Sequence, residues 1–174
     1  KWAQKITSLL TMQTLDGRVY EGDTRLRPSG ESGVLVSSLT AFEHYQRSSA
    51  WLWEHQALVR ARALCGGEQV MAAFGNIRQS ILTLPRDEAS VREEVRAMRQ
   101  KMRDHLGTRP EQQKAGIFHH KQDAGGIVDI EFMAQYGVLA WSGASPELAR
   151  FSDNVRLLDD MASAGRLPRA DADA

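Results

Sequence analysis

One stretch near the start of the chain combines a carboxylate with two guanidinium groups. Asp23, Arg25 and Arg27 alternate with other residues just before Pro28. Alternate side chains of a β-strand point to the same face, so a strand here would present the three charged groups together. Carboxylate oxygens bind hard cations such as Mg²⁺, and each guanidinium can bind two phosphate oxygens, so the pattern predicts a phosphate and metal site. The pattern also fits an edge strand with solvated charges and a local ion pair.

The elements that must position this stretch are a turn and two short strands. Asp16 and Gly17 are typical of a tight hairpin turn, because both accept positive φ angles. The first strand would follow over residues 19–28 and end at its proline, which cannot donate to a ladder. Residues 33–37 would form the second strand, and the apolar spacing in residues 1–13 predicts a helix before the turn.

The rest of the chain is helical in character. Apolar residues recur at intervals of three and four, most regularly at Val91, Val95, Met98 and Met102. The fold class is therefore mainly α with a small β-hairpin (α+β). The predicted helices cover residues 41–46 (capped by Ser38 or Thr40), 50–64, 67–84, 90–106 and 127–141, and a last helix begins after Ser152 or Asp153.

Two groups of arginines lie on the predicted helices. Arg60 and Arg62 come late in the helix over 50–64, where cations stabilise the negative end of the helix dipole. The same two side chains could instead reach a triphosphate. Arg96, Arg99 and Arg103 form a stripe along the predicted helix over 90–106. A charged stripe is typical of a solvated helix face, and the alternative is a wall that contacts ATP or a protein substrate.

A second informative segment precedes the apolar helix over 127–141. Gly125 and Gly126 lead into its first turn, where unpaired backbone N–H groups suit an anion such as phosphate. Asp129 and Glu131 are favourable near a helix N-terminus for dipole reasons alone. A different interpretation makes residues 128–132 a strand whose two acids form a metal pair. Because the apolar run is too long for a strand, we favour a helix that is buried almost all round.

Composition limits the classes of function. The 174 residues carry 22 basic and 22 acidic side chains, so the net charge of zero argues against bulk nucleic-acid binding. Cys65 is the only cysteine, which excludes an internal disulfide and a cysteine cluster for zinc. No apolar run approaches the roughly 20 residues that cross a bilayer, so we expect no membrane partner and a cytoplasmic location. The apolar content of 42% is that of an ordinary globular domain.

Four separated segments together resemble one protein family. Residues 23–30 read Asp-x-Arg-Leu-Arg-Pro-Ser-Gly, and residues 51–62 read Trp-Leu-Trp-Glu-His-Gln-Ala-Leu-Val-Arg-Ala-Arg. Residues 94–103 read Glu-Val-Arg-Ala-Met-Arg-Gln-Lys-Met-Arg, and residues 125–132 read Gly-Gly-Ile-Val-Asp-Ile-Glu-Phe. Their order and separations are similar to those of glutamine synthetase adenylyltransferases, over nearly the whole chain. The segment 51–62 looks closer to the C-terminal, adenylylating half of that two-headed enzyme.

The resemblance implies a fold, a reaction and a set of roles. Residues 1–38 would be the last strands of a polymerase-β-like nucleotidyltransferase domain, 39–168 a helical domain and 169–174 a frayed tail. The implied reaction transfers AMP from ATP to a tyrosine hydroxyl of glutamine synthetase, with Asp23 as the third catalytic carboxylate and a ligand of Mg²⁺. The implied partners are glutamine synthetase, the PII signal protein and ATP. The residues implied to contact the nucleotide are Arg25, Arg27, Arg60, Arg62, Lys121, Gly125 and Gly126.

Two other functions fit the same residues. The chain could belong to the deadenylylating head of the same enzyme, which uses phosphate to release ADP. It could also be a non-catalytic helical module whose arginines bind an acidic protein partner, with Asp23 structural. No Asp-x-Asp pair lies near Asp23, and the family's other acidic segments would precede Lys1, so we expect the chain to be inactive alone. His119 and His120 also depart from the family pattern, which has an acidic and then an apolar residue there.

Overall fold

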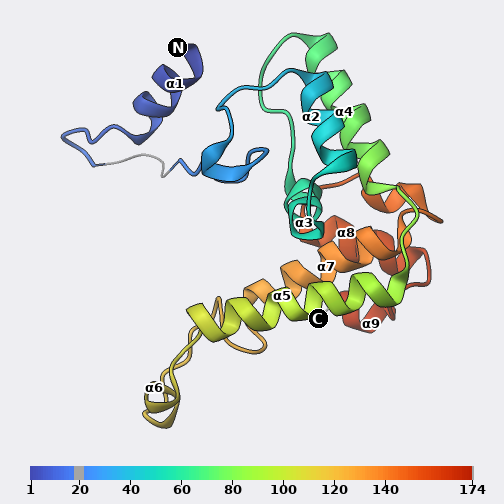
Figure 1. Ribbon diagram of the computed structural model, residues 1–174. Coiled ribbons are helices and arrows are strands. Elements are labelled where there is room, and N and C mark those ends of the chain that lie inside the picture. The colour runs from blue at the N-terminus through green and yellow to red at the C-terminus, as the bar shows by residue number, and fades with distance from the viewer. Residues whose placement is uncertain (18–21, 174) are drawn as a thin grey trace. The chain divides into compact units, whose positions relative to one another are not determined.

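The computed structural model describes residues 1–17 and 22–173, and their regular elements are all helices (Figure 1). The chain divides into two compact units, Lys1–Ala50 and Trp51–Ala174. This boundary follows the second helix, and the division into domains 1–38, 39–168 and 169–174 stays a prediction. The elements are α1 (Trp2–Thr11), the 3₁₀ turn η1 (Gly30–Ser32), α2 (Leu39–Ser48), α3 (Leu52–Arg60), α4 (Glu68–Leu82), α5 (Glu88–Leu106), α6 (Pro110–Lys114), α7 (Ile127–Trp141), η2 (Pro146–Ala149), α8 (Asn154–Ser163) and α9 (Arg169–Ala172).

Of the predicted β-hairpin, the described residues contain only the turn. Thr14 and Gly17 exchange two backbone hydrogen bonds of 3.0 and 3.2 Å as an isolated antiparallel bridge, which confirms the turn. Residues 19–21 of the expected first strand lie outside the described residues. The second strand, expected over 33–37, is wrong, because this described segment has no ladder partner. The guanidinium of Arg27 instead binds the carbonyls of Thr24, Glu31 and Gly33 and closes residues 24–33 into a compact loop.

Helix α3 is shorter than the sequence predicted. It begins after Trp51, whose N–H donates to the Glu54 carboxylate at 2.9 Å, and it ends at Arg60 rather than near residue 64. Ala61 is extended, so Arg62 lies beyond the helix. The reason is a side chain from α4. Arg78 donates to the Leu58 and Val59 carbonyls at 3.1 and 2.6 Å, and these carbonyls would have to accept from residues 62 and 63 if the helix continued.

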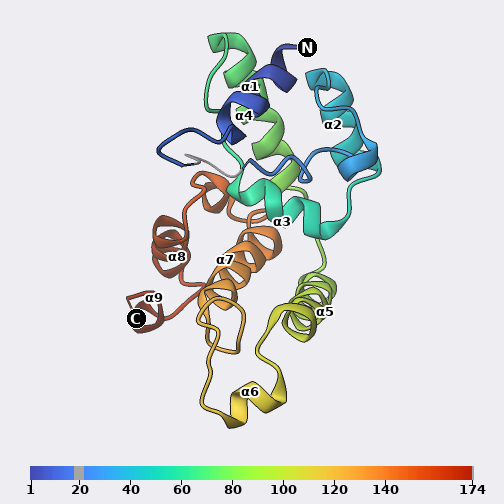
Figure 2. The same ribbon diagram turned by 90° about the vertical axis from the view of Figure 1, so that its left-hand side faces the viewer.

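Helix α7 forms the centre of the second unit and contacts α3, α5 and α8 (Figure 2). Ala134, Val138 and Leu139 are fully buried, and they pack with apolar side chains of the surrounding helices. A Cβ at Gly137 would lie 2.5 Å from the Met161 sulfur, so glycine is what allows α8 to approach this closely. Among the described residues, the other fully buried apolar side chains are Val59, Ile81, Leu82, Leu148, Ala149 and Leu157.

The prediction that α7 is buried almost all round holds only for its second half. Ile127, Ile130 and Met133, near its start, are 51%, 46% and 55% exposed. The strand interpretation of residues 128–132 is wrong, because all of them are helical. The exposed face arises because α3 and α8 cover other sides of the helix.

The remaining helix predictions agree closely with the structure. Helix α4 ends before Pro85, and α5 spans two residues more at its start than expected. Ser38 caps α2 by accepting from the Ala41 N–H at 3.1 Å, and Asp153 caps α8 by accepting from the Arg156 N–H at 3.1 Å. The segment expected to fray is helical through Ala172. No helix among residues 1–17 and 22–173 has the length and apolar character needed to cross a membrane.

Candidate functional site

Asp23 and Arg25 form a local ion pair in the first unit. The Asp23 carboxylate accepts from the Arg25 backbone N–H at 2.9 Å and from its Nη2 at 2.7 Å. The side-chain hydrogen bonds of Arg25, together with its backbone N–H, lower the pKa of Asp23 to about 2. The Asp23 side chain is 47% exposed, so this ionised carboxylate is open to solvent. The bonding is that of a turn, and the two side chains do not alternate along a strand.

Arg27 lies beside Asp23 but is used to hold its own loop. Besides its contact with the Thr24 carbonyl at 2.6 Å, it donates to the Glu31 and Gly33 carbonyls at 3.1 Å each. Asp23 and Arg27 both line a cavity of about 270 Å³ in this unit. The structure therefore brings the predicted residues Asp23 and Arg27 together at one cavity, while the Arg25 side chain is hydrogen-bonded to the Asp23 carboxylate.

The fit of Asp23 to a Mg²⁺ ion is that of a single ligand. A carboxylate oxygen is the right donor for this hard cation, and the low pKa keeps the group ionised at neutral pH. Elsewhere in the described parts of the chain, no three His, Cys, Asp or Glu side chains come together as a metal site. A metal at Asp23 would therefore need further carboxylates from outside these residues.

The two predicted arginines around α3 are in different environments. Arg60 donates to the Asn154 side-chain oxygen at 2.6 Å and so connects the end of α3 to the first turn of α8. Arg62 is exposed on the extended segment that follows α3. Arg60 is thus partly committed to packing. The exposed guanidinium of Arg62 is the one of the two that is available to a ligand of the second unit.

Lys121, Gly125 and Gly126 lie in the loop that enters α7. Lys121 is exposed, whereas both glycine N–H groups already have acceptors. Gly125 donates to an Asp129 oxygen at 2.7 Å, and Gly126 donates to the Asp123 carbonyl at 2.9 Å. To bind phosphate, these two N–H groups would have to leave their present acceptors. Gly125 has φ of +82°, which explains the glycine at that position.

Asp123 fastens the same loop from the other side. Its carboxylate is buried and accepts from the Thr108 N–H at 2.7 Å and from the His119 N–H at 2.8 Å. The hydrogen bonds from Thr108, followed by that from His119, lower the pKa of Asp123 to about 2. Asp123 therefore ties both ends of the excursion 108–119 together while it is ionised.

We expect the loop to loosen in acid. A folded-state pKa below the unfolded value of about 3.9 means that the carboxylate stabilises the fold fully above that pH and loses this effect as pH falls towards 2. In an NMR titration, the Thr108 and His119 amide resonances should shift together with a midpoint near pH 2. Asp123→Asn should remove the shared transition, and a midpoint near pH 4 in the unmodified chain would contradict the assignment.

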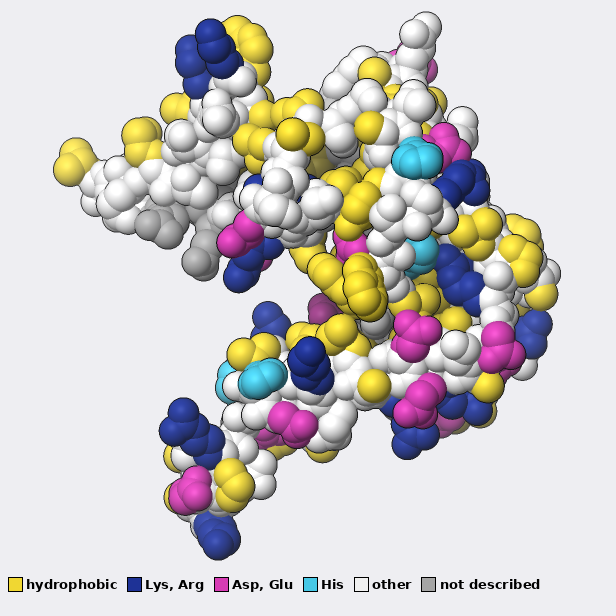
Figure 3. Space-filling view, in the orientation of Figure 1, with side chains coloured by type: hydrophobic (Ala, Val, Ile, Leu, Met, Phe, Trp, Pro, Cys, Tyr) yellow, Lys and Arg dark blue, Asp and Glu magenta, His cyan; other side chains and the backbone are white. Residues whose placement is uncertain are grey.

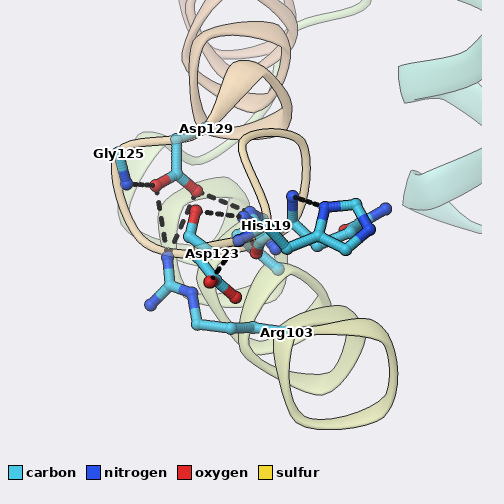
Figure 4. A network of polar contacts seen from close by, with 7 residues as sticks. Arg103, His119, Asp123, Gly125 and Asp129 are labelled. Atoms are coloured by element: carbon cyan, nitrogen blue, oxygen red, sulfur yellow. Dashed lines mark hydrogen bonds and ion pairs between the residues drawn. The ribbon is translucent and has the colours of Figure 1, made fainter. Parts of the chain in front are cut away.

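A buried ion-pair cluster holds α5 against the start of α7. The Asp129 carboxylate accepts from Arg99 Nε at 2.5 Å and from Arg103 Nη2 at 3.2 Å, and Arg99 also donates to the Gln122 carbonyl at 2.7 Å. Figure 4 shows Asp129 between Gly125 and Arg103. Partial burial raises the pKa of Asp129, but the Gly125 N–H and the two guanidinium groups more than offset this and hold it below its usual value.

The cluster corrects the prediction of a solvated arginine stripe and adds a residue that sequence reasoning missed. Arg99 is only 7% exposed, and Arg103 is half-buried, so only Arg96 of the three predicted arginines is on the surface. Sequence reasoning gives Asp129 a helix-dipole role or, on a strand, a place in a metal pair, and neither includes an ion pair with α5. The ion pair could have been predicted from two features of the sequence. One is a single acid, Asp129, in the first turn of an apolar helix, and the other is the presence of arginines at helical spacing on the long helix that precedes it.

Comparison with known proteins places these segments in a family. Residues 1–77 match the family model "GlnE: Glutamate-ammonia ligase adenylyltransferase". The chain is similar to the "Bifunctional glutamine synthetase adenylyltransferase/adenylyl-removing enzyme" of Acinetobacter baylyi, with 69% identity over 172 residues, which is 99% of this chain and 19% of that protein. The protein of the same name from Pseudomonas putida is 54% identical over 97% of this chain and 18% of its own length.

A more distant relative of the same name gives the same picture. The protein from Vibrio parahaemolyticus is 52% identical over 94% of this chain, which corresponds to 17% of its length. The chain thus spans about a fifth of the length of the curated relatives that it matches. The similarity includes both units, and with it the Asp23 loop and the loop that enters α7. The chain therefore belongs to the glutamate-ammonia ligase adenylyltransferase family.

Proposed function

We propose that this chain contributes to an active site that transfers AMP from ATP to a tyrosine hydroxyl of glutamine synthetase, as in the adenylylating half of the bifunctional enzyme. The observation that carries the proposal is the state of Asp23. It is an ionised, half-exposed carboxylate beside Arg27 at a cavity, in the segment that resembles the family's third catalytic carboxylate. The names of the relatives, which join adenylyl transfer and adenylyl removal, support the same reaction class.

The residues of the chain would have distinct tasks in this reaction. Asp23 would supply one oxygen ligand to Mg²⁺, and the bound ion would neutralise charge on the reacting phosphate. Arg25 fixes the orientation of that carboxylate through its bidentate contact, and Arg27 holds the loop that carries it. The exposed cations Arg62 and Lys121 are suited to phosphate oxygens of ATP. Two further acids would come from outside this chain, so the chain alone would be inactive.

The proposal includes the setting of the enzyme. We propose a polymerase-β-like nucleotidyltransferase domain that continues into the first unit and is followed by the helical second unit. The proposed partners are glutamine synthetase and the PII signal protein, and the proposed location is the cytoplasm. The even mixture of basic and acidic side chains over α5 and α6 in Figure 3 gives no broad basic surface on that face for nucleic acid.

Asp23→Asn tests the proposal in a complete enzyme. This chain is exchanged for the matching segment of the Acinetobacter baylyi relative, and labelled AMP transfer from ATP to glutamine synthetase is measured. The amide cannot replace a carboxylate as a metal ligand, so we expect the rate to fall about a hundred-fold or more. Asp16→Asn is the matched control, because it makes the same change at an exposed turn residue and should leave the rate within about two-fold.

The same variant separates the alternatives. If transfer is unchanged while phosphate-dependent removal of AMP from glutamine synthetase falls, the segment belongs to the deadenylylating head. If neither activity changes, Asp23 has no catalytic role. The hypothesis of a non-catalytic helical module that binds an acidic protein partner then replaces the proposal.

A further inference from the structure

A basic cleft of about 450 Å³ runs along the second unit between α5 and α7. Four arginines of α5 line it, at intervals of four, three and four residues, which places them on one helix face. Their side chains are supported by the aromatic rings of α7, since Arg92 lies 5.8 Å from the Tyr136 ring and Arg99 lies 6.0 Å from the Phe132 ring. The lining arginines are Arg92, Arg96, Arg99 and Arg103.

The cleft has more positive than negative charge. Arg92 pairs with Glu88 at 2.7 Å, and Arg99 and Arg103 share the single carboxylate of Asp129. Arg96 forms no ion pair or hydrogen bond with any residue that the structure describes. One carboxylate therefore serves three guanidinium groups on this face, and the surplus charge faces the cleft.

Two buried donors in the cleft wall also lack acceptors. Arg99, whose side chain is 8% exposed, has no acceptor for its Nη1 within the described ranges, and the Nε of Arg103 is in the same state. Buried N–H groups of charged side chains are normally paired, because desolvation without a partner is costly. A solvated helix face does not explain a buried arginine with a spare donor, whereas an oxyanion entering beside Arg96 would provide several acceptor oxygens at once.

We propose that this cleft, which Asp23 does not line, binds the phosphate or diphosphate group of a small ligand. Guanidinium forks match phosphate oxygens in pairs, and adjacent turns of α5 offer several forks on one face. The volume is that of a small-molecule site, and a docked acidic protein would need a far larger contact surface, on the order of 800 Å² per partner. Asp129 does not oppose the anion strongly, because both of its oxygens already accept from Arg99, Arg103 and Gly125.

Titration of the 174-residue chain tests this site. Calorimetry is carried out at fixed ionic strength and without divalent ions, using inorganic phosphate, pyrophosphate and ATP as separate ligands. We expect saturable binding of pyrophosphate with one site per chain. Equal affinity for ATP and pyrophosphate would show that only the phosphate groups are recognised, and much tighter binding of ATP would identify a nucleotide as the source of those groups; both results support the site.

Matched variants of α5 locate the binding. Arg96→Ala removes an exposed side chain without described partners, so the fold should be retained, and the dissociation constant should rise about ten-fold or more. Lys101→Ala removes one positive charge from the same helix but outside the cleft, and it should change the constant less than about two-fold. Asp23→Asn should have no effect, so this test and that of adenylyl transfer can fail separately.

Three results would overturn the proposal. The first is the absence of saturable binding by all three phosphate compounds. The second is an equal loss of affinity in Arg96→Ala and Lys101→Ala, which would indicate general charge attraction. The third is binding of a poly-glutamate peptide but of none of the phosphate compounds, which would make the cleft part of a protein docking surface.

Discussion

Replacing Arg78 with methionine is expected to lower the free energy of unfolding of the second unit by about 3–5 kcal/mol, because it leaves several buried acceptors unpaired. Arg78 is 7% exposed and donates to four carbonyls, those of Leu58, Val59, Ala149 and Phe151, at 2.6 to 3.1 Å. Burial lowers the pKa of its guanidinium, but the group stays charged at neutral pH. Among the described residues, no carboxylate pairs with this guanidinium. The partial negative charges of the carbonyl oxygens at the ends of α3 and η2 stabilise its positive charge instead.

Urea unfolding followed by tryptophan fluorescence measures this loss, since three of the four tryptophans lie in the second unit. Arg62→Met is the matched control at an exposed position and should change stability by less than about 0.5 kcal/mol. Arg78→Lys keeps the charge but cannot reach four carbonyls, so it should fall between the two. If Arg78→Met is as stable as Arg62→Met, the carbonyl contacts contribute nothing net and our account of this arginine is wrong.

Asp129→Ala is expected to cost about 3 kcal/mol, the lower end for breaking a buried ion pair, because the carboxylate is 24% exposed. The change leaves the buried guanidinium of Arg99 without its carboxylate and frees the Gly125 N–H. Both α5 and the loop before α7 should therefore loosen together. Hydrogen exchange should show faster exchange in the loop over 119–126 as well as lower global stability.

The control for this change is Glu131→Ala, which removes an acid two residues further along the same helix. The pH dependence adds an independent check. Since the folded-state pKa of Asp129 lies below its unfolded value of about 3.9, its contribution is complete above that pH and declines as pH falls through the folded value. Stability of the unmodified chain should thus fall more steeply below pH 4 than that of Asp129→Ala. Equal slopes would show that Asp129 is not held ionised by Arg99 and Arg103.

The long helices could be predicted because their apolar spacing is local. The four-three-four steps from Val91 to Met102 predicted α5, and Pro85 marked the end of α4. The failures arise from side chains distant in sequence or from unforeseen loop contacts. Arg78 ends α3 from another helix, and Arg27 closes its loop where a second strand was expected. Neither contact could be predicted from the helix or strand propensities of residues 50–64 or 33–37 alone.

The site was predictable in composition more than in arrangement. Sequence reasoning selected Asp23 and Arg27, which line one cavity, but it placed them on a strand. It placed Arg99 in a stripe that was either solvated or a wall for ATP or a protein substrate, because helical spacing gives the face of a residue and not the partner of that face. Arg99 meets Asp129, which is thirty positions away along the chain, and only the packing of α5 on α7 creates that contact.

The dependence of α3 on Arg78 also has a consequence for cooperativity. Helices shorter than about 12–15 residues are marginal in isolation, and α3 has nine. Its terminal carbonyls are completed by α4, and its Gln56 side chain donates to Gln135 of α7 at 3.0 Å. Helix α3 therefore has no reason to persist when α4 separates from it, and the three helices should form and dissolve as a single folding unit.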